Sequence, residues 1–304
     1  MKQNLRKKAL VPAIAMVLAS VIALTGVTYA WFTTGNTASV TGLDVNVQTA
    51  NGIQISLDAA SWRSVITADD IRTAVTNATS YADRTIQFPG VEIAPVSSAG
   101  IVADGKLQMF YGEYNKDGTL RSEAEVEQNR TSGGNFVAFD LFFKSSMDQT
   151  LTLKMGDAAS FVKGTSSMGG SATVGTEKAV RVAFLPMGSA ATPAAARALK
   201  GDGEVMIWEP NASSRADGVE AEGGKLAYDG FKAEFDAVAE NELGSTEVAT
   251  VETFNADQDI VTLKAGINKI RVYIWLEGQD VDCINNISFG DFTANLAFSV
   301  PEVE

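Results

Sequence analysis

Phe136-Val-Ala-Phe-Asp-Leu-Phe-Phe143 is the stretch that decides the fold class. Its odd-numbered residues are all apolar, which is typical of one buried face of a β-strand. Its even-numbered residues are also apolar except for Asp140, so the second face should be covered as well. The stretch therefore predicts a strand that lies deep between two packed β-sheets.

The same alternation of apolar and polar residues recurs before and after this strand. Clear strands near both ends of the chain favour a single sandwich in which the first and last strands meet, and no repeat or linker divides it. We therefore expect an all-β body. The further alternating rows are 43–48, 53–58, 151–153, 180–184, 269–277 and 295–300.

The connection Ala50-Asn51-Gly52 predicts a β-hairpin between the first two of these strands. A two-residue turn would pair apolar with polar residues and mix the faces. A three-residue loop, with Gly52 at positive φ, instead pairs Val47 with Ile55 and Val45 with Leu57.

Two more expectations concern one strand neighbour and one strand end. The strand at 151–153 is expected beside the strand at 136–143, and the strand that begins at Val180 is expected to end at Pro186.

Helices are expected to be few and peripheral. Thr67 followed by Asp70 resembles a capping box and predicts a helix to about Asn77. Thr192-Pro193 predicts the start of an alanine-rich helix that ends at Gly201. Phe231, Phe235 and Val238 at helical spacing predict a helix over 229–243. The stretches 156–176 and 211–224 are rich in Gly, Ser and Ala with scattered charges, which predicts long surface loops.

The N-terminus is typical of an export signal. Ala9 to Gly26 carries no charge, and Thr28-Tyr29-Ala30 supplies the small residues that a signal peptidase requires. We expect cleavage after Ala30, which makes Trp31 the new N-terminus and the protein secreted, either extracellular or at the cell surface. The positive charges before the apolar run are Lys2, Arg6, Lys7 and Lys8.

Two other interpretations of this segment stay open. The apolar run is close to the roughly 17 to 25 residues that span a bilayer, so it could be an uncleaved anchor. A cut near Lys8 and Ala9 would instead produce a pilin-like subunit that retains the apolar helix. The preferred division is a signal peptide over 1–30, an extended segment over 31–42 and a β-sandwich domain over 43–304.

The charge balance restricts the partners. Four of the 24 basic residues lie in the signal, which leaves 20 against 37 acidic residues. This surplus of negative charge would repel nucleic acid and anionic lipid, so we expect neither as a partner. We expect contact with the membrane only through the signal segment, before cleavage.

The residue inventory also restricts the chemistry. The chain has no histidine, which excludes Ser-His-Asp and Cys-His mechanisms and HExxH zinc sites. Cys283 is the single cysteine, so no intramolecular disulfide can form. Nothing identifies a pair of catalytic carboxylates, and we predict that the protein is not an enzyme.

Two acidic stretches are candidates for calcium ligands. Asp117 lies in a partial match to a calcium loop, and Glu277, Asp280 and Asp282 follow a predicted strand. The first match lacks the glutamate of its twelfth position, and solvated turns explain both stretches. We therefore expect no cofactor, with calcium as the alternative.

Thr28-Tyr-Ala-Trp-Phe-Thr-Thr-Gly-Asn36, followed by Val-Thr-Gly-Leu-Asp-Val-Asn-Val from Val40, resembles the exported TasA and camelysin family of Gram-positive matrix proteins. The resemblance covers about residues 20 to 58. Separately, the stretch from Ile274 to Asn286 is similar to the C-terminal part of uncharacterised exported proteins of Firmicutes.

The resemblance implies a jelly-roll-like antiparallel β-sandwich that assembles into extracellular fibres. The N-terminal strand of one subunit would complete a sheet of the next, so the partners are other copies of the chain and components of the cell surface or matrix. Carried over, the donor strand spans about Trp31 to Val40 and includes Phe32 and Thr33. The metalloprotease activity associated with camelysin-like members is not carried over, because the chain has no histidine.

One function of a different class remains as an alternative. The loops predicted at 156–176 and 211–224 could make the protein a secreted or anchored module that binds glycans or a host surface.

Overall fold

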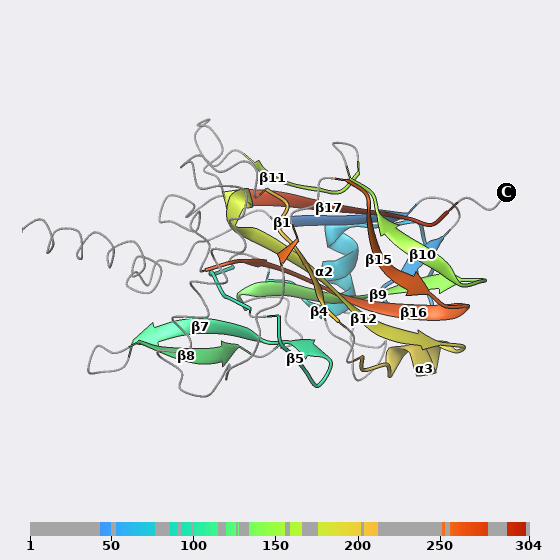
Figure 1. The fold of residues 1–304 in the computed structure, drawn as a ribbon, viewed down its shortest axis with the longest axis horizontal. Coiled ribbons are helices and arrows are strands. Elements are labelled where there is room, and N and C mark those ends of the chain that lie inside the picture. The colour runs from blue at the N-terminus through green and yellow to red at the C-terminus, as the bar shows by residue number, and fades with distance from the viewer. Residues whose placement is uncertain are drawn as a thin grey trace, which may run out of the picture.

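The computed structural model describes most of the body between Leu43 and Pro301 (Figure 1). The body is mostly β-strand with few helices, so the all-β expectation is confirmed. The described residues are 43–49, 53–76, 86–89, 93–98, 100–114, 120–125, 127, 134–155, 159–165, 176–201, 204–211, 251–252, 256–278 and 291–301.

The first sheet, called sheet A, contains six strands, with β17 and β1 near its middle. β1 (Leu43–Thr49) runs parallel to β17 (Asp291–Ser299), with Leu43 beside Phe292 and Thr49 beside Phe298. The first and last strands of the body therefore meet, as expected. The other members are β15 (Gln258–Leu263), β10 (Gln149–Leu153), β3 (Val65–Ile66) and β11 (Phe161–Thr165), which pairs with β17.

The second sheet, called sheet B, contains seven strands built around three long central ones. These are β12 (Val180–Ala190), β16 (Gly266–Leu276) and β9 (Phe136–Ser145), paired antiparallel in that order. Shorter strands complete the sheet at β14 (Val251–Glu252), β13 (Met206–Trp208), β2 (Gln54–Ser56) and β4 (Ile86–Gln87). Because β13 and β14 also pair in parallel, both sheets are mixed rather than purely antiparallel.

The main core lies between the two sheets, which Figure 1 shows one above the other. Val45 and Leu296 of sheet A and Phe139 and Val272 of sheet B are fully buried in it. The helix α2 (Ala68–Thr76) contacts β1 and β4, and its Ile71 is also fully buried in this core.

A third layer covers the other face of sheet B. It contains two small two-stranded sheets, β5 (Val102–Ala103) with β6 (Lys106–Leu107) and β7 (Met109–Tyr114) with β8 (Leu120–Glu125), which Figure 1 shows below sheet B. Leu107, Met109 and Phe110 pack there against Phe136 and Trp275. Both faces of β9 are thus buried as predicted, but its second face meets this third layer and α3 (Pro193–Arg197) rather than another sandwich sheet.

The predicted hairpin at Ala50-Asn51-Gly52 is wrong. β1 lies in sheet A, where Val47 is paired with Ile66 and Leu296, whereas β2 lies in sheet B, where Ile55 is paired with Phe143. The chain crosses from one sheet to the other between them. A dry face can be buried equally well against the opposite sheet, so alternation alone does not separate the two arrangements.

The predicted neighbour of 136–143 is wrong for the same reason. β10 pairs with β15 and β17 in sheet A, so the chain again changes sheets between β9 and β10. Ser145 stabilises this crossing, because its hydroxyl donates to Met147 O at 2.6 Å and accepts from Gln149 Nε2 at 2.8 Å.

Two strand boundaries also differ from the expectation. β12 continues beyond Pro186 to Ala190, because a bulge between Pro186 and Gly188 accommodates the missing N–H group. Within the predicted loop over 156–176, residues Phe161–Thr165 form β11, and a short 3₁₀ helix, η1 (Thr176–Ala179), follows at its end.

The helix expectations are largely confirmed. α2 is preceded by the predicted capping box, with Thr67 N donating to Asp70 Oδ2 at 2.9 Å and Asp70 N donating to Thr67 Oγ1 at 3.3 Å. α3 starts at Pro193 with Thr192 as its cap, but it ends at Arg197 rather than Gly201. The predicted helix over 229–243 lies outside the described residues.

Among the described residues, no helix is long and apolar enough to cross a membrane. The apolar run from Ala9 to Gly26 lies outside them.

Candidate functional site

Most residues that the sequence singles out lie outside the described part of the chain. This applies to the assembly residues Trp31, Phe32, Thr33 and Val40, to the cleavage position Ala30, and to the carboxylates Asp117, Asp280 and Asp282.

Glu277 is the one predicted site residue that the structure describes. Its side chain is buried, and Oε2 accepts a hydrogen bond from Trp275 Nε1 at 3.1 Å. No group of three or more acidic or cysteine side chains that could hold a metal ion occurs within the described ranges. The contact with Trp275 therefore gives Glu277 a packing role at the end of β16.

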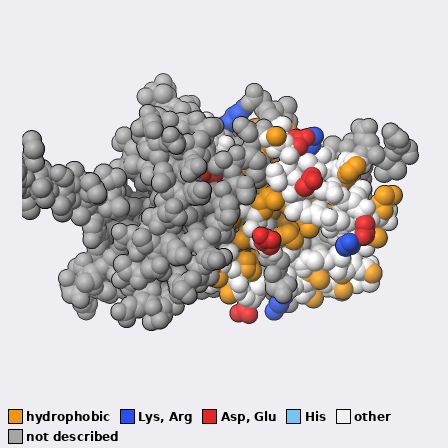
Figure 2. All heavy atoms as spheres, viewed as in Figure 1, with side chains coloured by type: hydrophobic (Ala, Val, Ile, Leu, Met, Phe, Trp, Pro, Cys, Tyr) orange, Lys and Arg blue, Asp and Glu red, His pale blue; other side chains and the backbone are white. Residues whose placement is uncertain are grey.

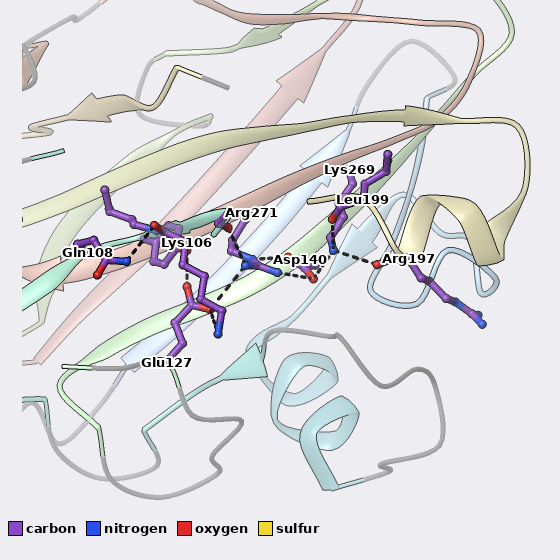
Figure 3. A network of polar contacts seen from close by, with 11 residues as sticks. Lys106, Gln108, Glu127, Asp140, Arg197, Leu199, Lys269 and Arg271 are labelled. Carbon is purple, nitrogen blue, oxygen red and sulfur yellow. Dashed lines mark hydrogen bonds and ion pairs between the residues drawn. The ribbon is translucent and has the colours of Figure 1, made fainter. Parts of the chain in front are cut away.

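The side chains with the most distinctive chemistry lie between sheet B and the third layer that covers it. We call them the ionic network: Lys106, Glu127, Asp140, Lys269 and Arg271, which Figure 3 labels, together with Tyr273. Asp140 is 0% exposed, Lys269 is 1% and Arg271 is 4%. Charged side chains are almost never buried unless they are paired, so the contacts of these three residues show what the site can do.

Arg271 and Asp140 form the centre of the network. They lie directly opposite each other on β16 and β9. Arg271 Nε donates to Asp140 Oδ1 at 2.7 Å, and Nη2 donates to Oδ2 at 3.3 Å. Arg271 Nη1 donates to Gly105 O at 3.0 Å, so the same side chain also fastens the β5–β6 turn to sheet B.

Glu127 joins the network from the third layer, and its side chain is 3% exposed. Its Oε2 is 3.6 Å from Arg271 Nη1 and 3.8 Å from Lys106 Nζ, and its Oε1 accepts a hydrogen bond from the Tyr273 hydroxyl. Leu107 N donates to the same Tyr273 oxygen at 3.0 Å. Sheet B and the third layer are therefore joined by charged and neutral hydrogen bonds as well as by apolar packing.

Lys269 lies on the opposite side of Asp140 from Glu127, as Figure 3 shows. Its Nζ is 3.1 Å from Asp140 Oδ2 and donates to Arg197 O and Leu199 O, each at 3.2 Å. These carbonyl groups belong to the last turn of α3 and the residues after it. Lys269 thereby connects β16 to the end of α3, which is not part of a β-sheet.

The pKa shifts agree with this geometry. Burial acts to lower the pKa of Arg271, but the attraction of Asp140, the hydrogen bonds to it and the charge of Glu127 outweigh burial and raise the pKa. Burial raises the pKa of Tyr273, and the charge of Glu127 raises it further. Arg271 therefore stays charged and Tyr273 stays a protonated hydroxyl that donates to Glu127.

A second buried ion pair lies on the same face of sheet B. Arg181 of β12 and Glu209, which follows β13, are joined at 2.9 Å between Nη2 and Oε1, and both side chains are 0% exposed. Arg181 is also opposite Trp275 on β16, whose indole contacts Glu277. The pair links a short edge strand to the centre of the sheet.

Sequence analysis did not predict that this face of β16 is buried, although the sequence contains an indication of it. Lys269, Arg271 and Tyr273 alternate with apolar residues in β16, which is also the pattern of a solvated face. The distinguishing feature is Asp140, a single acid inside an otherwise apolar strand, because such a residue requires a basic partner. Only the register of β9 against β16 identifies that partner as Arg271.

Surface charges of the described residues also form ion pairs, for example Lys264 with Asp148 at 2.8 Å. On the face drawn in Figure 2, acidic and basic side chains of the described residues are spread among polar and apolar ones, and in places a basic side chain lies next to an acidic one.

In the comparisons with known proteins, no protein-family model, no curated protein and no solved structure matched the chain.

Proposed function

We propose that the protein is a structural subunit of an extracellular filament or surface matrix and not an enzyme. In this proposal the leader is removed after Ala30, and residues 31–42 of one copy add a strand to a sheet of the next copy. The jelly-roll arrangement implied by the resemblance to the TasA and camelysin family is part of the same proposal.

The supporting observation is the place of β1 in sheet A. β1 starts at Leu43 beside Phe292, at the end of the sheet where β17 also starts. The candidate donor strand directly precedes Leu43 in the sequence, so it is attached at this end of the sheet. Twelve extended residues span at most about 40 Å, which is comparable to the longest strands of sheet B.

The contacts of the buried charged side chains also support a structural role. The contacts of Arg271, Asp140 and Glu127 join strands and layers. Extended strand donation needs a rigid acceptor body, because main-chain hydrogen bonds to a sheet edge form only where that edge is held in place.

Deletion of the donor strand tests the proposal. The chain is expressed from Trp31 with and without residues 31–40, and filaments are sought by electron microscopy. We expect filaments from the longer chain and monomers from the shorter one. Monomers in both cases would contradict the proposal, and a monomer that binds a glycan array would favour the binding module instead.

A variant with altered side chains tests whether the donor strand docks through Trp31 and Phe32, without shortening the chain. Replacing Trp31 and Phe32 by alanine should weaken assembly, because these two residues supply the large apolar side chains of the donor. Met147→Ala is the matched control, since Met147 is an apolar residue of the body with 46% exposure. Equal assembly of the two proteins would exclude Trp31 and Phe32 as anchors.

The N-terminal residue of the native protein tests the processing step. Trp31 at the terminus would support the proposed donor strand. A start near Ala9 or Leu10 would indicate a pilin-like subunit, and an intact Met1 would indicate an anchor.

A further inference from the structure

We propose that Lys269 and Asp140 form an intramolecular amide bond that joins β16 to β9 covalently. The two side chains are 1% and 0% exposed, and their Nζ and Oδ2 atoms are 3.1 Å apart. This inference is independent of the proposed function, because it concerns bonding within one copy of the chain.

The contacts of Lys269 orient its amine toward the carboxyl group. Two of its N–H bonds donate to Arg197 O and Leu199 O, and the Nζ atom forms an ion pair with Asp140 Oδ2. When the remaining proton of the ammonium group passes to the carboxyl group, the two carbonyl groups still hold the amine beside Asp140. The atom that the amine attacks is Asp140 Cγ, which is bonded to the Oδ2 atom that lies 3.1 Å from Nζ, so the two groups are already in contact.

Arg271 supplies the electrostatic support for the reaction. Its Nε donates to Asp140 Oδ1 at 2.7 Å, the oxygen that retains the negative charge after the amine attacks. A fixed donor at that position stabilises the tetrahedral intermediate. We expect the bond to form once, during maturation.

The reaction balances without a cofactor or an oxidant. The bond between Lys269 Nζ and Asp140 Cγ forms, the bond between Cγ and Oδ2 breaks, and Oδ2 leaves as water. Both protons of this water come from the ammonium group, and the third stays on the amide nitrogen.

The site also suits the product. The amide oxygen can keep the hydrogen bond from Arg271 Nε, and the amide N–H can keep one of the two carbonyl partners. Condensation replaces a buried ion pair, whose desolvation is unfavourable, by a neutral group. The product would provide a covalent link in a chain whose single cysteine cannot form an intramolecular disulfide.

Mass spectrometry of the intact secreted protein tests the inference. We expect a mass lower by one water molecule than the sequence requires, and a proteolytic fragment in which the peptides of Asp140 and Lys269 remain joined. A full sequence mass, together with cleavage by trypsin after Lys269, would overturn the proposal.

Variants assign the loss of water to this pair. Asp140→Ala and Lys269→Arg should each restore the full mass, whereas Asp140→Asn should retain the link with loss of ammonia. Asp117→Ala is the control, because cyclisation at Asp117-Gly118 would also remove one water molecule. A loss of water that disappears in Asp117→Ala but persists in Asp140→Ala would overturn the proposal. If a variant fails to fold, the presence or absence of the joined fragment in the wild-type protein decides.

Discussion

The ring of Phe298 in sheet A meets the ring of Phe143 in sheet B edge to face, with centroids 5.3 Å apart. Phe184 of β12 approaches Phe298 in the same manner at 5.9 Å. Aromatic pairs in this geometry contribute beyond the area that they bury. Phe298 therefore connects the last strand of the body to two of the three central strands of sheet B.

Replacing Phe298 by alanine should lower the free energy of unfolding by about 3 to 5 kcal/mol, because it leaves a cavity between the sheets. Chemical denaturation of the wild-type and variant proteins measures the change. Met147→Ala is the control and should change stability by less than about 0.5 kcal/mol, as is usual for exposed positions. A similar effect of the two substitutions would mean that the sheets do not depend on this contact.

The buried pair of Arg181 and Glu209 should respond unequally to single and double substitution. Arg181→Met leaves a buried carboxylate without its guanidinium and should cost about 3 to 5 kcal/mol. The double variant Arg181→Met, Glu209→Leu should recover much of that loss, since no unpaired charge remains. A double-mutant cycle by denaturation measures the coupling, and additive losses would show that the two residues act separately.

Asp58 should make stability sensitive to acid. Burial acts to raise its pKa, but hydrogen bonds from the backbone of Ser61 and Ala60 and from the Ser56 hydroxyl lower it from 3.8 to about 2. Since the folded-state pKa is lowered, the stabilisation is present above about pH 4 and is lost as the pH falls toward 2. Allowing for solvent exposure, it amounts to about 1 kcal/mol.

The Asp58→Asn variant isolates this contribution. It should be less stable than the wild-type protein at neutral pH, and the difference should shrink between about pH 4 and 2. Denaturation at a series of pH values measures it. A difference that stays constant across this range would show that Asp58 is not the titrating group.

The capping box of α2 gives a local prediction. Thr67→Ala removes the oxygen that accepts from Asp70 N and should cost about 1 kcal/mol. Thr67→Ser retains this oxygen and should be close to the wild-type protein in melting temperature. Equal melting temperatures for the alanine and serine variants would show that the cap does not limit stability.

The sequence predicted those parts of the fold that depend on local pattern. The two buried faces of β9 follow from its apolar residues, and the start of α2 follows from Thr67 and Asp70. The crossings after β1 and β9 could not be predicted, because a strand with one dry face is satisfied by a hairpin partner or by the opposite sheet. That choice depends on contacts between residues far apart in the sequence.

The candidate site could also be predicted only in part. Glu277 was recognised as a carboxylate beside a strand, but its burial against Trp275 depends on the third layer. The polar residues of β16 looked solvated because the sequence does not specify that β5 to β8 cover them. Asp140 was visible as an exception in an apolar strand, and its pairing with Arg271 required the register.

The parallel pairing of β1 with β17 has a consequence for biosynthesis. Leu43 is paired with Phe292, so the central ladder of sheet A closes only after nearly the whole body has been synthesised. Pairings with such large sequence separation form slowly, because the chain loses loop entropy before it gains the contacts. A nascent chain that still lacks Asp291–Ser299 therefore cannot form the β1–β17 ladder, and sheet A is completed only at the end of synthesis.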